Sequence, residues 1–135
     1  MSDEFTIQSA LYSVLSSDAG LTALGPTVVD FGPSEEDASG LYPYVAIGGL
    51  IFDASDTDNT TGFDMAGRVH TWGNNGAKQV RDIQGAMYDA LHLQALTVTG
   101  FNSVLLYRES SQIMRAASGA FHGVCEYRWL LTRTA

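Results

Sequence analysis

The chain offers few side chains for proton-transfer or nucleophilic chemistry at neutral pH, namely three histidines and one cysteine. His70 and His122 fall in expected strands, and His92 ends an expected helix, where it would complement the helix dipole. Cys125 follows His122 by three residues, so on a strand the two side chains would point to opposite faces. This spacing excludes a local Cys–His dyad. We therefore expect Cys125 to be an inert, partly buried side chain.

The acidic segment 53–64 begins like a calcium-binding loop, with the sequence DTDNT from Asp56 to Thr60. The match fails at two required positions, because Thr61 stands at the sixth position and Gly67 at the twelfth. The sequence also contains no phosphate-binding glycine motif and no Gly-x-Ser-x-Gly nucleophile motif. We expect no catalytic residue, no cofactor and no metal, and we interpret residues 53–64 as an exposed acidic arm.

Two amphipathic helices are expected to support the rest of the chain. Apolar residues recur at helical spacing over 3–17, and a second helical pattern covers 77–92. Strands are expected at 28–31, 41–52, 64–72, 103–115 and 121–134, with a bulge or a close backbone approach at Gly48-Gly49. A short loop joins the last two strands as a hairpin. The order predicts a single α+β domain over 1–135, an antiparallel sheet of about four to five strands with two main helices on one face.

Charge is divided unevenly along the chain, whose formal net charge is −8. Residues 1–64 hold 11 acidic and no basic side chains, whereas residues 65–135 hold 4 acidic and 7 basic ones. This balance opposes binding to nucleic acid and favours charge-steered contacts between proteins. The alternative, that acidic loops only keep the protein soluble, remains open. No apolar run approaches a membrane span, and the acidic start lacks the features of a secretory signal, so we expect synthesis in the cytoplasm.

Four segments together resemble the tail-completion or tail-terminator proteins of long-tailed phages and gene transfer agents, over about residues 5–133. The segments are, in chain order, Leu41-Tyr42-Pro43-Tyr44-Val45-Ala46-Ile47-Gly48, Gly67-Arg68-Val69-His70-Thr71-Trp72, Met87-Tyr88-Asp89-Ala90-Leu91 and Phe121-His122-Gly123-Val124. The resemblance implies a structural virion protein and no enzymatic activity. It implies a homo-oligomeric ring, a hexamer, that caps the tail tube, stops its growth and provides the docking surface for the head and neck.

The same resemblance implies the partners and the location. The tail tube protein would lie on one side and a head-side neck or connector protein on the other, with DNA only in transit through the lumen and no membrane partner. The protein would stay in the host cytoplasm during assembly and then at the head-proximal end of the virion tail. Two alternatives remain: another head–tail connector such as a head-closure or stopper protein, and a small ligand-binding or enzymatic domain. The second would require a pocket with convergent polar groups near His70 or His122.

Candidate subunit or partner interface residues come from the acidic arm, the strand arginines and two packing positions. The arginines could pair with the acidic half of the next copy, a head-to-tail contact that closes into rings, or they could be unpartnered surface residues. Trp72 could be core or seam, and Gly85 a surface glycine or a point of close approach by a neighbouring backbone. The candidates are Asp53, Asp56, Asp58, Asp64, Arg68, Trp72, Gly85, Arg108, Arg115, Arg128 and Arg133.

Overall fold

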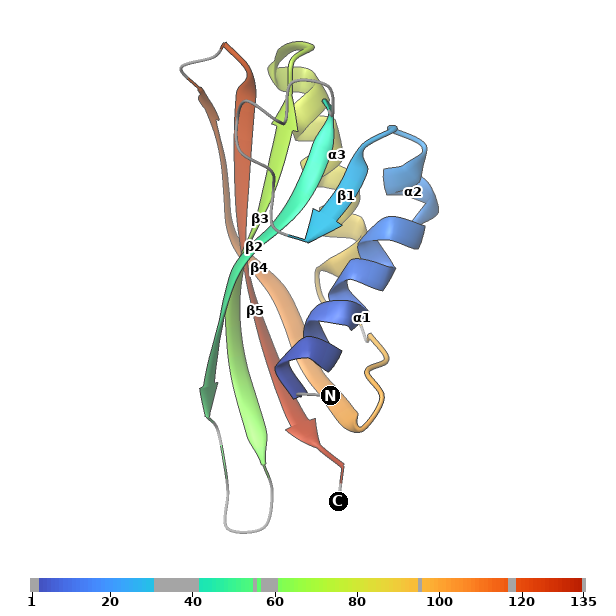
Figure 1. Cartoon of the computed structure of the whole chain (residues 1–135), viewed down its shortest axis with the longest axis vertical. Helices are drawn as coiled ribbons and strands as arrows, with labels where there is room; N and C mark the ends of the chain where they lie inside the picture. Colours follow the sequence, from blue (N-terminus) through green and yellow to red (C-terminus); the bar gives the residue numbers. More distant parts are fainter. Residues whose placement is uncertain are drawn as a thin grey trace.

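A strongly twisted sheet runs along the molecule, and the helices lie beside it (Figure 1). The computed structural model describes residues 3–30, 42–54, 56, 61–94, 96–116 and 119–134. The elements are, in chain order, α1 (Asp3–Ser17), α2 (Ala19–Thr22), β1 (Thr27–Asp30), β2 (Tyr44–Ala54), β3 (Gly62–Gly73), α3 (Gly76–Leu91), β4 (Phe101–Arg115) and β5 (Phe121–Arg133). None of the described helices combines the length and the apolar character needed to cross a bilayer.

The sheet has five strands in the order β1-β2-β3-β5-β4 and is mixed. β3 pairs antiparallel with β2 and with β5, and β4 and β5 form the expected antiparallel hairpin. The expectation of a purely antiparallel sheet is wrong, because β1 pairs parallel with β2. The segment between Asp30 and Tyr44 spans 13 residues, which meets the dozen or more that a parallel crossover needs.

Shifts in strand register interrupt the regular pairing of β2 and β4. β2 shifts register between Ile47 and Leu50, which confirms the bulge expected at Gly48-Gly49. β4 shifts between Ser103 and Leu105 and again between Arg108 and Ser110, which the sequence did not indicate. A bulge increases local twist and redirects the edge of a strand. Both outer parts of the sheet are therefore bent partway along their length.

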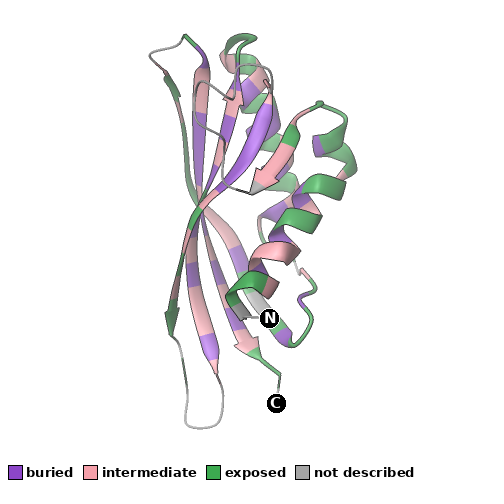
Figure 2. Ribbon diagram, in the orientation of Figure 1, coloured by how far each residue is buried: buried purple, intermediate pink, exposed green. Residues whose placement is uncertain are grey.

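The main core lies between α3 and the sheet, with α1 and α2 completing it (Figure 2). α3 packs on β3, β4 and β5, while α1 reaches the sheet at β1 and also contacts α2 and α3. Three helices thus build the layer where two main ones were expected. The helical pattern expected over 77–92 is confirmed: α3 buries Val80, Ile83, Met87 and Leu91 along one face, with Ala90 partly buried, and Gln84 is buried with them. From β5 the core receives Cys125, Tyr127, Trp129 and Leu131.

Two strand glycines, Gly123 and Gly73, lie directly beneath side chains of α3. A Cβ at Gly123 of β5 would lie 2.5 Å from Nε2 of Gln84 and 2.7 Å from Cγ1 of Val80. A Cβ at Gly73 of β3 would lie 2.5 Å from Oε1 of Gln79. The ends of the Gln84 and Gln79 side chains could move aside, but the buried Val80 side chain could not, so the position of the helix depends most on Gly123 having no side chain.

Candidate assembly surface

Side chains of β3 and β5 alternate between the core and the face of the sheet opposite α3, which we call the open face. Met65 and Val69 of β3 and Cys125 of β5 belong to the core, so their chain neighbours point to the open face. Because β3 and β5 pair in register over twelve residues, their open-face side chains form continuous cross-strand rows. Several candidate interface residues fall in these rows.

Ion pairs tie three strands together on the open face. Nη2 of Arg128 lies 2.7 Å from Oδ2 of Asp64, and its Nη1 lies 3.7 Å from Oε1 of Glu109. Nε of Arg68 lies 3.1 Å from Oε1 of Glu126. The hydrogen bond and the charge of Asp64 raise the pKa of Arg128 above its usual value. Arg68 and Arg128, for which pairing across a subunit seam and an unpartnered surface position were both open, thus have partners within their own chain, and so does the interface candidate Asp64. Whether these residues also contact a neighbouring copy stays a prediction.

The remaining candidate arginines do not join this network. Arg108 points to the helix side, where Nη1 donates to the Gln84 carbonyl at 3.1 Å and the guanidinium lies over the Tyr88 ring. Arg115 lies over the ring of Phe121, 5.0 Å from its centroid. The backbone N–H of Arg133 donates to the Thr61 carbonyl at 2.7 Å. The five candidate arginines therefore occupy separate places and form no single basic patch.

The described part of the acidic arm continues the β2–β3 ladder. Asp53 is exposed and lies opposite Asp64, which is held by Arg128. Oδ1 of Asp56 accepts a hydrogen bond from the Gly62 N–H at 3.0 Å. Asp58 lies outside the described residues. Within the described ranges, no group of three or more His, Cys, Asp or Glu side chains is placed to hold a metal ion.

Two histidines that sequence reasoning treated separately form a pair on the open face. Nδ1 of His70 and Nε2 of His122 are 2.8 Å apart, and the ring centroids are 5.0 Å apart at an interplanar angle of 22°. This geometry places the rings edge to edge, with one nitrogen donating to the other. Trp72 stacks face to face on His122 at 3.9 Å, and its next neighbour is Tyr44 at 6.3 Å. Trp72 thus belongs to a small open-face cluster with Tyr44, outside the main core.

Burial lowers the pKa of both imidazoles. The charge of Arg68 lowers the pKa of His70 further, and repulsion from His70 lowers that of His122. The pKa of His122 falls to about 4. The sequence could have suggested the pair only through the strand register, which places Trp72 opposite His122 and His70 one diagonal step away. That register is a property of the fold.

We expect the His70–His122 pair to make stability depend on pH in a defined window. In the unfolded chain the rings take up protons near pH 6.5, whereas His122 resists protonation until about pH 4 in the folded chain. The contribution of neutral His122 to the free energy of unfolding is therefore complete above pH 6.5, and it is lost as the pH falls towards 4. The stability difference between wild type and His122→Gln, measured by urea unfolding, should shrink across this range. A difference that stays constant from pH 7 to pH 4 would contradict the expectation.

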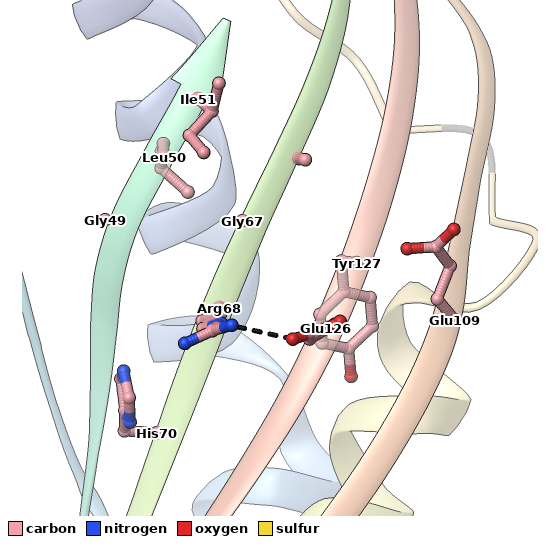
Figure 3. Close-up of a pocket in the computed structure, with 10 residues that line it drawn as sticks. Gly49, Leu50, Ile51, Gly67, Arg68, His70, Glu109, Glu126 and Tyr127 are labelled. Atoms are coloured by element: carbon pink, nitrogen blue, oxygen red, sulfur yellow. Dashed lines mark hydrogen bonds and ion pairs between the residues drawn. The ribbon is translucent and has the colours of Figure 1, made fainter.

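A shallow groove of about 610 Å³ lies beside the histidine pair on the open face (Figure 3). Gly49 and Gly67 contribute no side chains to its floor, while Ile51 lies on one side. Its charged groups and its histidine are engaged, because Arg68 binds Glu126, Glu109 pairs with Arg128 and His70 binds His122, whereas the buried Tyr127 hydroxyl has no hydrogen-bond partner among the described residues. The groove therefore lies where a ligand-binding or enzymatic alternative would need a pocket. Its histidine is hydrogen-bonded to His122, and Arg68 and Glu126 are paired with one another.

His92 and Gly85 complete the account of the candidates on α3. Nδ1 of His92 accepts the backbone N–H of Arg108 at 3.0 Å, so the ring holds β4 as well as ending the helix. Gly85 is exposed, and a Cβ there would meet no atom of the described chain within 4 Å. Its own chain does not require a glycine at this position. Close approach by a neighbouring subunit remains a prediction.

The described residues thus form a mixed sheet whose open face carries ion pairs and a histidine pair. Three buried side-chain oxygens, Oδ1 of Asp64, Oγ1 of Thr71 and Oη of Tyr127, have no hydrogen-bond partner among the described residues. A chain described as "Virion of native gene transfer agent (GTA) particle" shares this fold, with a TM-score of 0.79 over 93% of this chain and 94% of that chain. The two are 21% identical, so the likeness concerns the fold alone. Among curated proteins, none matches the sequence.

Residues 9–132 match the family model "Tail completion protein gp17", and the chain belongs to this family. It is accordingly a structural tail protein and not an enzyme. The resemblance inferred from the four sequence segments is confirmed. The histidine pair, the ion pairs and the groove are therefore features of a tail protein.

Proposed function

We propose that this protein is the terminator of the tail tube. Six copies form a ring on the last ring of the tube, stop its growth and present the docking surface for the head-side neck. Family membership over residues 9–132 carries the proposal, and the fold shared with a chain of a gene transfer agent virion supports it. Assembly takes place in the host cytoplasm, and the finished ring lies at the head-proximal end of the tail.

The charge distribution supports a ring that DNA crosses without binding. Six chains of net charge −8 carry −48 together, and an acidic lumen repels the phosphate backbone. Asp53 and Asp56 are exposed near the end of the β2–β3 hairpin. We place these carboxylates, together with Asp58, towards the channel or a partner ring. The ion pairs of the open face stay within the chain and keep the sheet rigid at that surface.

Loss of the gene tests the proposal. Particles made without the chain should carry tubes of irregular, excessive length and no attached heads, as measured on negative-stain micrographs. A head-closure or stopper protein would instead leave tubes of normal length beside heads that lose their DNA. Tubes of normal length would therefore overturn the terminator assignment in favour of that second candidate.

Complementation of the same deletion tests the acidic arm. The triple change Asp53→Asn, Asp56→Asn and Asp58→Asn should reduce the fraction of tails joined to heads. The single changes Asp53→Asn and Asp89→Asn form a matched pair, because each removes one exposed carboxylate, from the arm and from α3 respectively. Equal rescue by the triple variant and wild type would reject a role for the arm.

A further inference from the structure

The outer edge of β2 is covered along only half of the strand. Residues Tyr44–Ile47 pair with β1, and the bulge at Gly48-Gly49 follows. Beyond it, Leu50–Ala54 pair with β3 on the inner side, and no described strand pairs with the outer side. In Figure 1 this part of β2 extends beyond β1 towards the hairpin end. Considering the described residues alone, its outward backbone groups form an edge of five residues, which we call open.

The outer edge of β4 has the same organisation at the other side of the sheet. Before the bulge between Arg108 and Ser110, the residues that follow α3 cover this edge. The Leu93 N–H donates to the Leu106 carbonyl at 2.7 Å, and the Arg108 N–H donates to His92. Beyond the bulge, Ser110–Arg115 pair with β5 alone among the described strands. One backbone group there, the Gln112 carbonyl, accepts a hydrogen bond from Gln84 at 3.2 Å.

Each open edge follows a bulge and carries one charged side chain, Asp53 on β2 and Arg115 on β4, but neither contains the two residues that most directly block strand addition. Natural edge strands are commonly blocked by lysine or proline, and neither residue occurs in Leu50–Ala54 or in Ser110–Arg115. Both segments instead expose a large apolar side chain on the open face, with Ile51 63% and Met114 43% exposed. An edge with these properties is suited to pairing with another strand.

We propose that the ring seam is a strand pairing between copies, in which the open edge of β2 in one subunit joins the open edge of β4 in the next. The inference rests on the proposed ring. Charge favours pairing β2 with β4 over pairing two copies of the same edge, because β2 carries Asp53 near its end and β4 ends in Arg115. Pairing two β2 edges would bring the carboxylates of two arms together. Because the joined surfaces differ, the contact repeats around a closed ring.

A single strand pairing between two subunits is weak, whereas the set of pairings in a closed ring is strong. Five residues at about 3.3 Å each give a ladder of roughly 17 Å, which holds only a few hydrogen bonds. Each subunit of a closed ring uses both edges, so every further contact forms at a high effective concentration. The subunit can therefore remain separate in solution and assemble on the tube.

Engineered disulfides in assembled particles test the seam. Ile51 points to the open face, as do Gln112 and Met114, which lie opposite Val124 and His122. Particles rescued by Ile51→Cys combined with Gln112→Cys, or with Met114→Cys, should give a ladder of linked chains up to six on a non-reducing gel. The two β4 positions sample two registers, because a disulfide needs Cα atoms within about 7 Å.

Single variants and a distant position provide the controls. Each single cysteine should remain monomeric on the gel, and wild type should too, because native Cys125 is fully buried. Ile51→Cys combined with Tyr12→Cys on the exposed side of α1 should not form a ladder. Dimers from Ile51→Cys alone, or from Met114→Cys alone, would show like-with-like pairing and overturn the proposal.

The result also separates this inference from the proposed function. If variant particles end their tails at normal length without any cross-link in either register, the seam lies elsewhere and the terminator assignment stands. If tails without the gene keep their normal length, the proposed function itself fails. A ladder in rescued particles supports both.

Discussion

Replacing Gly123 by valine is expected to displace α3 from the sheet and to destabilise the fold by about 1–3 kcal/mol. The new side chain would begin 2.5 Å from Nε2 of Gln84 and 2.7 Å from Cγ1 of Val80, and both belong to the buried stripe of α3. The displacement also affects β4, because the residues that follow α3 cover its edge at Leu106 and Arg108. Urea unfolding followed by circular dichroism measures the loss.

Gly85→Ala, on the exposed side of α3, is the control for Gly123→Val, which lies on β5 beneath the same helix. Because Gly85 is exposed with open space around it, alanine should raise stability by up to about 1 kcal/mol. The two variants should therefore differ in sign. Equal destabilisation would contradict the packing described for α3. Gly85→Ala also tests the predicted subunit contact, since a more stable chain that rescues fewer tails would indicate close packing by a neighbour at Gly85.

Replacing Trp129 by alanine is expected to have the largest effect on stability, a loss of about 3–5 kcal/mol. Trp129 has no exposed surface and lies in β5, which pairs with both β3 and β4. Alanine would leave a cavity at the centre of the core that neighbouring strands cannot fill without breaking their ladders. A loss of this size removes much of the 5–15 kcal/mol that stabilises a typical domain.

Ile51→Ala supplies the contrast for Trp129→Ala. Ile51 is 63% exposed, so truncation should change the free energy of unfolding by less than about 0.5 kcal/mol. The same variant removes an apolar contact from the proposed seam. Reduced tail rescue with unchanged monomer stability would support the strand-pairing seam, whereas full rescue would show that Ile51 contributes nothing to assembly. A large loss of monomer stability would mean that Ile51 is packed against the chain itself.

Sequence periodicity predicted most of the elements because it reflects local geometry. The stripe of α3 follows from the 3.6-residue repeat, and the alternation along β5 places Cys125, Tyr127 and Trp129 on the core face. The hairpin of β4 and β5 follows from the short connection between them. The paired glycines in β2 marked a bulge, because glycine in a strand interior weakens regular pairing.

Contacts between distant residues were not predictable in this way. The parallel pairing of β1 and the insertion of β5 between β3 and β4 depend on strand order, which no local repeat encodes. Arg128 and Asp64 are separated by 64 residues, and His70 and His122 by 52. The arginines were correctly expected on or at the ends of strands, but the partners considered for Arg68 and Arg128 lay in another copy. The structure pairs both within the chain.

The sequence by itself determined the class of elements, the division of charge and, through the order of its four segments, the tail-completion family. Helical and strand periods, turn residues and charge counts are properties of short stretches, so they can be read without a fold. Only the tertiary structure decided which side chains meet on the open face and where the sheet edges remain open. Those depend on strand register and order, which arise when segments far apart in the chain pack around one core.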